Sequence, residues 1–106
     1  MARLPYRTIA VSGASMSPTY NDGDWLLFRT VELLNASGLR PLIDKVVVIE
    51  RESFPGVLLI KRVIRIDSSG IWVEGDNKEA STDSRNWGAI TPPEIRGRVL
   101  LRYRGG

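Results

Sequence analysis

Serine and lysine are the side chains best suited to hydrolytic chemistry in this sequence, because its 106 residues include neither histidine nor cysteine. Without histidine no Ser-His-Asp triad can form, and without cysteine there is no thiol nucleophile, thiolate metal site or disulfide. A hydroxyl nucleophile would have to be activated by a carboxylate, a lysine amine or the chain terminus. The lysines are Lys45, Lys61 and Lys78.

Lys61 lies inside an apolar run, with Val57–Ile60 before it and Val63-Ile64 after Arg62. A lysine with the ordinary pKa near 10.4 is neutral only about once in 2,500 at pH 7, but burial can lower that pKa by several units. A buried Lys61 could therefore accept a proton. The alternative is a structural lysine at a strand edge, or one whose stem packs while its amine reaches water. Arg62 would point to the other face of a strand and stay solvated.

Ser15 lies in a segment of small residues, Ser12–Thr19, that could present a hydroxyl to a substrate. Gly13 leaves room for a substrate backbone to approach, and Pro18 fixes the exit of the chain. A serine hydroxyl becomes a good nucleophile when a base takes its proton, and Lys61 is the well-placed amine for that role. The alternative is that the serines of this segment satisfy backbone groups of a turn.

The remaining charged residues do not point to a cofactor, a metal or a nucleic acid. Asp22 and Asp24 lack the spacing of a calcium loop and are explained by turn chemistry, and no phosphate-binding glycine loop is present. The net charge is +3, from 15 Lys plus Arg against 12 Asp plus Glu. Arginines alternate with apolar residues over 96–104, which predicts a strand with one solvated face; a basic surface for phosphates or anionic lipid is the alternative.

The elements that must position these residues are short β-strands joined by turns. Periodicity and β-branched residues predict strands over residues 6–11, 25–30, 45–50, 57–66, 71–74 and 96–103. Val31–Ser37 alone is predicted to be helical, and Gly38 and Pro41 end it. The length suits one domain over residues 1–106, without a secretory signal or membrane span. We therefore expect a mainly β fold with at most one short helix.

Three segments resemble, in chain order, the signature motifs of the signal peptidase I family of serine proteases. The match covers almost the whole chain and implies a β catalytic core of the signal peptidase and LexA-like kind. The segments are Gly13–Thr19 with Gly23-Asp24 for the nucleophile box, Leu59–Ile64 for the lysine box, and Gly75–Asn77, Ser81–Arg85 and Trp87-Gly88 for the third signature.

The resemblance implies a role for each matching residue. Ser15 would attack the scissile carbonyl, and Lys61 would serve as the general base. Ser81 would orient the Lys61 amine through its hydroxyl. Asp83 and Arg85 would pair to hold the third signature in shape. Backbone groups of the nucleophile box, at Gly13, Ser15 and Met16, would bind the oxyanion and the substrate. Asp76 and Asn77 would have structural roles at the site.

Three departures from the family pattern are visible. The family's membrane anchor is absent from the sequence, and only thirteen residues separate Lys61 from Gly75, so the large β insertion of many bacterial members is missing. Ile43-Asp44-Lys45 stands where the family usually has Arg-Gly-Asp. The ending Gly97–Arg104 is similar to that of short members associated with maturation of nickel-type superoxide dismutase.

These observations predict a Ser-Lys endopeptidase that removes an N-terminal leader or signal segment from a protein precursor. The resemblance implies small substrate residues just before the cut, and no cofactor, metal or nucleic acid. We expect a cytoplasmic location, with peripheral attachment to a membrane as the alternative. The alternative functions are a regulatory autoprotease module similar to LexA and a catalytically inactive peptide-binding domain.

Overall fold

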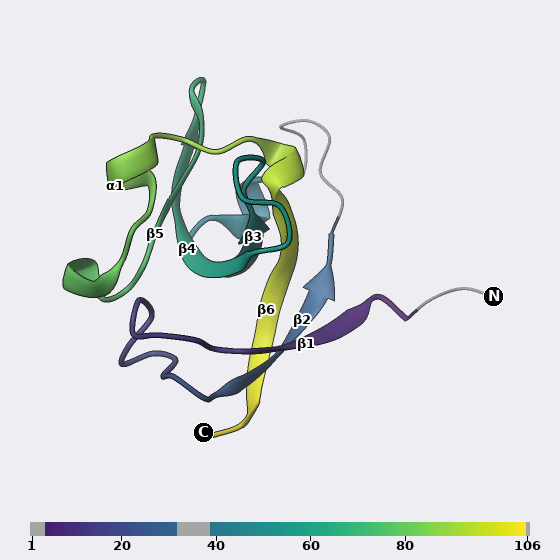
Figure 1. Cartoon of the computed structure of the whole chain (residues 1–106). Coiled ribbons are helices and arrows are strands. Elements are labelled where there is room, and N and C mark those ends of the chain that lie inside the picture. The colour runs from purple at the N-terminus through teal and green to yellow at the C-terminus, as the bar shows by residue number, and fades with distance from the viewer. Residues whose placement is uncertain (1–3, 32–38, 106) are drawn as a thin grey trace.

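Six runs of alternating or β-branched residues form the six strands of a single antiparallel sheet, as the computed structural model shows for residues 4–31 and 39–105 (Figure 1). The strand order across the sheet is β1-β2-β6-β3-β4-β5. The prediction of a mainly β fold is confirmed, and the strand boundaries differ from the predicted ones by a few residues at most. The strands are β1 Tyr6–Ala10, β2 Trp25–Thr30, β3 Val46–Glu50, β4 Leu58–Asp67, β5 Gly70–Glu74 and β6 Ile95–Arg104.

Helical structure is confined to short segments between the strands. The one α-helix of the described residues, α1, spans Ser84–Trp87, and single 3₁₀ turns are formed by Arg40–Leu42, Lys78–Ala80 and Pro92–Glu94. The predicted helix over Val31–Ser37 falls outside the described residues except for Val31. No helix within residues 4–31 and 39–105 has the length and apolar character to cross a membrane.

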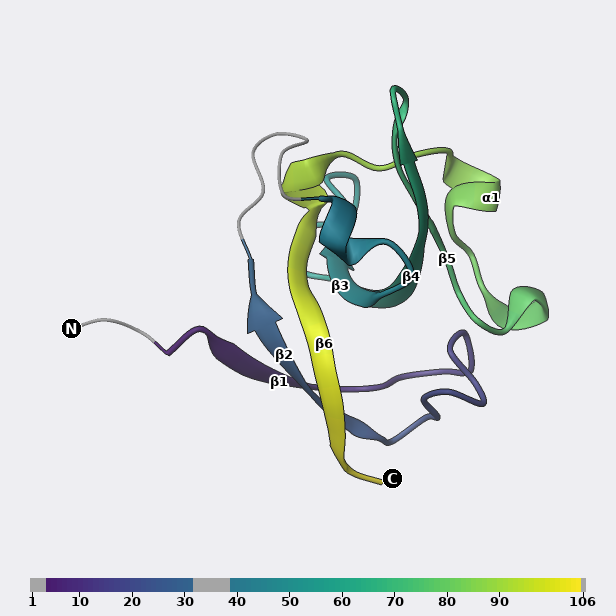
Figure 2. The same cartoon turned by 180° about the vertical axis from the view of Figure 1, so that it is seen from behind.

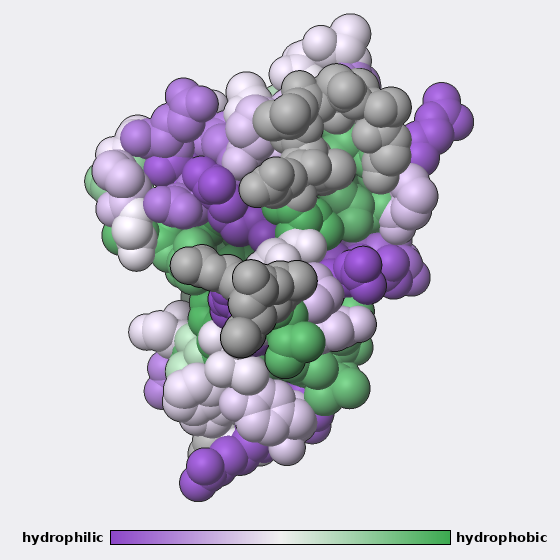
Figure 3. Space-filling model, turned by 90° about the vertical axis from the view of Figure 1, so that its right-hand side faces the viewer, coloured by the Kyte–Doolittle hydropathy of each residue, from purple (hydrophilic) through white to green (hydrophobic). Residues whose placement is uncertain are grey.

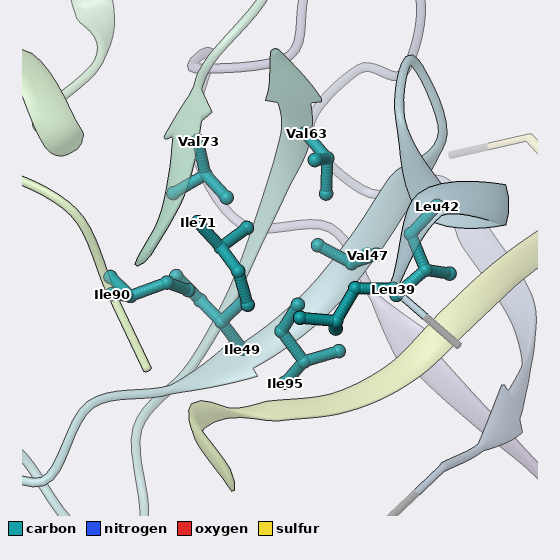
Figure 4. Close-up of a cluster of buried hydrophobic side chains, with 9 residues drawn as sticks. All are labelled: Leu39, Leu42, Val47, Ile49, Val63, Ile71, Val73, Ile90 and Ile95. Atoms are coloured by element: carbon teal, nitrogen blue, oxygen red, sulfur yellow. The ribbon is translucent and has the colours of Figure 1, made fainter. Parts of the chain in front are cut away.

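The centre of the sheet is buried on both faces. Val47 and Ile49 of β3 belong to one buried cluster, and Val46 and Val48 belong to the other, because successive side chains of a strand point to opposite faces. Figure 4 shows the first cluster, in which β3, β4, β5 and β6 contribute side chains. Its members are Leu39, Leu42, Val47, Ile49, Val63, Ile71, Val73, Ile90 and Ile95.

The strand β6 joins the two parts of the sheet. It pairs with β2 on one side and β3 on the other, so it runs between the β1–β2 pair and the β3–β4–β5 group (Figures 1 and 2). Its pairing shifts register twice along β2, which breaks the strict alternation of faces. Leu100, Leu101 and Tyr103 are all exposed, so the predicted alternation of a buried and a solvated face over residues 96–104 does not continue to the end of the strand.

Two segments that are distant in sequence meet beside the sheet and carry the residues of interest. The loop after β1 lies next to the segment after β5 in both views of the molecule (Figures 1 and 2). The Asn77 N–H donates to the Ser15 carbonyl at 2.9 Å, and the Thr19 hydroxyl donates to Asp76 at 2.6 Å. These bonds fix Ser15 against the third signature.

Candidate active site

Lys61 is placed in the interior by its position on β4. It pairs with Val47 of β3, so its side chain lies on the same face as the first buried cluster. Only 3% of the residue is exposed. The apolar run around Lys61 therefore buries the amine, which is the setting that the general-base hypothesis requires.

The amine of Lys61 has one side-chain hydrogen-bond partner among the described residues, the hydroxyl of Ser81. The Lys61 Nζ donates to Ser81 Oγ at 3.0 Å, and Ser81 Oγ donates in turn to Asp83 Oδ2 at 2.6 Å. A serine hydroxyl has one proton to donate, and here it goes to Asp83. Ser81 can therefore only accept a hydrogen bond from the amine. This bond uses one N–H of Lys61, and the remaining positions on its nitrogen are not bonded to Ser81.

Asp83 is fully buried and receives five hydrogen bonds at its carboxylate. Burial raises its pKa, but bonds from the Arg85 guanidinium, the Ser81 hydroxyl and the N–H groups of Gly75 and Arg85 outweigh that effect and hold the pKa far below its usual range. Arg85 binds both carboxylate oxygens, at 3.0 and 2.8 Å. Asp83 is therefore an ionised anchor, and it also caps α1 through the Arg85 N–H.

Three influences act on the pKa of Lys61. Desolvation by burial is the largest, and it lowers the pKa because the charged ammonium loses its water. The negative charge of Asp83 raises the pKa, whereas the positive charge of Arg85 lowers it. Because desolvation is the largest of the three influences, the net result is a pKa below that of an exposed lysine.

The loop that carries Ser15 is held from several directions. The Gly13 N–H donates to Asp22 at 2.7 Å, and Gly13 has a φ of 86°, which favours glycine. Met16 is buried in the second cluster, and its sulfur accepts the Asp76 N–H. Ser15 lies between these anchors and is half-buried.

Ser15 and Lys61 line the same pocket, which has a volume of about 370 Å³. Gly13 lines it as well, whereas Met16, Asp76, Asn77, Asp83 and Arg85 do not. The structure thus separates the predicted residues into those that face the pocket and those that support it from behind. The full lining is Ser12, Gly13, Ala14, Ser15, Arg51, Phe54, Val57, Leu59, Lys61, Ala80, Thr82 and Trp87.

Arg62 differs from its sequence-based expectation. Instead of being solvated, it is half-buried and binds both oxygens of Asp76, at 2.9 and 2.8 Å. It also donates to the Asp44 carbonyl at 2.8 Å. The pair lowers the pKa of Asp76 and ties β4 to the segment that contacts Ser15. The strand alternation showed that Arg62 turns away from Lys61, but it could not show that Asp76 meets it there.

Sequence reasoning also missed Arg51, which lines the pocket. Its Nε donates to the buried carboxylate of Glu94 at 2.8 Å, and its guanidinium lies 4.5 Å from the centre of the Trp87 ring. Arg51 and Glu94 are far apart in sequence and share no motif. The Thr91-Pro92-Pro93-Glu94 sequence is a capping-box signal that could have drawn attention to Glu94.

The chain is similar to known proteases. Residues 65–104 match the family described as signal peptidase, peptidase S26; this segment includes Ser81 and Asp83 but neither Ser15 nor Lys61. Mitochondrial inner membrane protease subunit 1 of Xenopus tropicalis is 32% identical, covering 89% of this chain and 66% of the relative. Mitochondrial ATP-independent inner membrane protease subunit 1a of Arabidopsis thaliana is 30% identical, covering 90% and 68%.

The chain belongs to the signal peptidase family, peptidase S26. It spans about two thirds of the length of the curated relatives it matches. Membership supports a peptidase that removes leader segments. The expected cytoplasmic location is wrong, because the relatives are subunits of proteases of the mitochondrial inner membrane. The similarity to proteins that mature nickel-type superoxide dismutase is not tested by these relatives and stays a prediction.

Replacing Asp83 by asparagine is expected to destabilise the fold by about 3 kcal/mol, because an amide cannot accept all these bonds and leaves Arg85 unpaired. The folded pKa of Asp83 lies below its unfolded value, so the carboxylate stabilises the fold above about pH 4 and that stabilisation is lost as the pH falls further. Urea unfolding from pH 2 to 7 should show the gap between parent and variant closing in acid. An equal gap at every pH would contradict the assignment.

Proposed function

We propose that this protein is a serine endopeptidase that uses Ser15 as nucleophile and Lys61 as general base to remove an N-terminal leader from a protein precursor. The observation that carries the proposal is that both residues line one pocket while Lys61 is buried and hydrogen-bonded to a neutral hydroxyl. Its family and the relatives' names, which are those of proteases, support a precursor as the substrate.

The reaction follows from these positions. The neutral Lys61 amine takes the Ser15 Oγ proton as Oγ bonds to the scissile carbonyl carbon. The backbone N–H of Ser15 stabilises the oxyanion, and the Lys61 ammonium then returns the proton to the leaving amine as the C–N bond breaks. In the second half, Lys61 takes a proton from water, water oxygen bonds to the acyl carbon, and Ser15 leaves with a proton from Lys61.

The support behind the pocket suits an amine base. Ser81 fixes the direction of one Lys61 N–H, so the lone pair of the neutral amine can be directed toward the pocket. Arg85 offsets part of the Asp83 charge, which weakens the tendency of that carboxylate to keep Lys61 in its charged form. Ser81 thus favours the orientation of the amine, and Arg85 favours its neutral state.

Replacing Ser81 by alanine is expected to lower kcat by about 10- to 100-fold, because the amine loses its orienting acceptor. Ser84→Ala is the matched control: its hydroxyl accepts the buried Val73 N–H at 2.9 Å, so it should cost stability without changing kcat of the folded enzyme. Single-turnover cleavage and thermal unfolding of both variants separate the two effects. Equal kcat for Ser81→Ala and the parent would remove Ser81 from the mechanism.

The proposal is tested by mixing the purified protein with a labelled precursor and reading the new N-terminus by mass spectrometry. The parent should release a leader and form a covalent adduct of its acyl half on Ser15. Ser15→Ala should do neither. Ser17→Ala is a control in the same loop, since the Ser17 hydroxyl bonds to Asn21 at 2.6 Å rather than facing the pocket, and it should cleave normally. Cleavage by Ser15→Ala at the parental rate would refute the proposal.

The surface supports action at a membrane. Exposed apolar side chains occur on β1, β2 and β6 or next to them, and Figure 3 shows apolar residues exposed among strongly hydrophilic ones on the side that faces right in Figure 1. Aromatic and apolar groups beside arginines suit the interface of a bilayer with anionic lipid. The exposed apolar residues on or next to these three strands are Leu4, Tyr6, Trp25, Leu100, Leu101 and Tyr103.

A further inference from the structure

The pocket that contains Ser15 and Lys61 has a second basic side chain in its wall, Arg51. Two contacts fix the orientation of its guanidinium. Nε donates to Glu94 Oε2 at 2.8 Å, and the guanidinium carbon lies 4.5 Å from the centre of the Trp87 ring. Glu94 is itself held by the Thr91 N–H and hydroxyl, at 2.9 and 3.0 Å. Arg51 is therefore positioned by buried structure and is not a freely rotating surface side chain.

The outer end of Arg51 is left for a ligand. Within residues 4–31 and 39–105, Nη1 and Nη2 have no hydrogen-bond partner, although each carries two N–H groups. The planar pair of nitrogens matches the two oxygens of a carboxylate. Arg51 and Lys61 are the ionisable residues in the pocket lining, and no Asp or Glu is among the lining residues. The pocket therefore favours a negatively charged group.

The position of Lys61 indicates which part of a substrate would enter this pocket. In the proposed reaction, Lys61 returns its proton to the leaving amine, which belongs to the residue after the cut. Lys61 lines the larger pocket but is absent from the lining of a second hollow of about 70 Å³ beside Ser15. That smaller hollow is lined by residues such as Val11, Met16 and Ile60, and its size suits a small side chain. The residue before the cut and the residue after it thus have separate places.

We propose that the larger pocket binds the side chain of the first substrate residue after the cut and that Arg51 selects an Asp or Glu at that position. The apolar wall formed by Phe54, Leu59 and Trp87 would contact the methylene groups, and the guanidinium would bind the carboxylate. This inference rests on the proposed peptidase function and gives it a substrate preference.

The test uses peptides that share one leader and differ only at the first residue after the cut, as Asp against Asn and Glu against Gln. The ratio of kcat/KM within each pair measures the preference for the charge and is independent of the folded fraction of enzyme. The parent should favour the acid by about tenfold, the size expected for a hydrogen-bonded charge pair. Arg51→Gln should bring the ratio near one. Arg96→Gln removes an arginine that is paired with Glu50 outside this pocket, and it should keep the tenfold preference for the acidic peptide.

Loss of Arg51 leaves the buried Glu94 without its cation, so a second variant guards against misfolding. Arg51→Gln with Glu94→Gln removes both charges together, and it should cleave the neutral peptides while lacking the acid preference. Cleavage by the parent with no preference at this position, or with the preference unchanged in Arg51→Gln, overturns the inference and leaves the peptidase proposal standing. Failure of the parent to cleave any of these peptides or the labelled precursor overturns both.

Discussion

Replacing Lys61 by methionine is expected to reduce cleavage by about 10⁴-fold or more, the order of magnitude seen when the base of a serine protease is removed. Methionine keeps an unbranched apolar stem of similar length, so the interior of β4 stays filled. It cannot accept the Ser15 proton, and the chain has no histidine to substitute for it. Single-turnover cleavage of a labelled precursor measures the loss.

The same variant is expected to be at least as stable as the parent. The folded pKa of Lys61 is lowered below its unfolded value, so burial of the ammonium destabilises the parent fully at acid pH, and this penalty is relieved as the pH rises through the folded pKa toward the unfolded value of about 10. Lys61→Met should therefore gain most in free energy of unfolding at low pH. Lys78→Met alters an exposed lysine and is the matched control for both measurements. An inactive variant that is also unfolded would leave no support for a chemical role.

Replacing Gly75 by alanine is expected to lower kcat at least about 10²-fold and to destabilise the fold by about 1–3 kcal/mol. A Cβ at this position would lie 2.6 Å from both the Ser15 carbonyl oxygen and Ser81 Cβ, and it would also collide with Ser81 Oγ. The backbone of Gly75 is not in the left-handed region, so the cost is purely steric. The added methyl would push Ser15 and Ser81 apart and misalign the amine between them.

Gly105→Ala is the matched control, because the nearest heavy atom to its added Cβ is Asp24 Oδ1 at 3.9 Å. Chemical denaturation and kcat should both be unchanged for that variant. If Gly75→Ala kept parental kcat, Ser15 and Ser81 would not need the close approach that the structure gives them.

Local sequence patterns were sufficient for the strands. The run Val46–Ile49 is β-branched throughout, and it forms part of the predicted strand, which the structure shows to be buried on both faces. The turn after β4 also depends on local sequence, because the Ser69 N–H donates to the Asp67 carboxylate there. These features depend on residues that are neighbours in the sequence, so they can be predicted from one sequence alone.

The helix between Gly75 and Gly88 could not be predicted from local patterns. Its helix α1 has four residues, too few for any periodicity, and it forms because Asp83 caps it and Asn86 completes a capping box. Asp44 is a similar case: it has a φ of 71°, a region that Asp tolerates better than most residues, at the position where the family pattern has glycine. Backbone conformations of this kind are difficult to predict from the residue types alone.

The long-range pairs around the site were beyond local reasoning. The contact between Arg51 and Glu94 and that between Arg62 and Asp76 join segments brought together by sheet order, which no spacing rule encodes. The resemblance to a family supplied the roles of Ser81, Asp83 and Arg85, and the structure adds that their hydrogen bonds form one chain ending at Lys61. It also adds the burial that lowers the pKa of Lys61.

The central claim is that burial lowers the pKa of Lys61 so that its amine can act as a base, and lysine titration by NMR tests this claim most directly. The chain has three lysines, so selective labelling gives three signals, with the exposed Lys45 and Lys78 as internal references. We expect the signal that is absent from Lys61→Met to titrate below the pH of about 10.4 that is usual for a lysine. A Lys61 signal that titrates at about 10.4 or above would contradict the account.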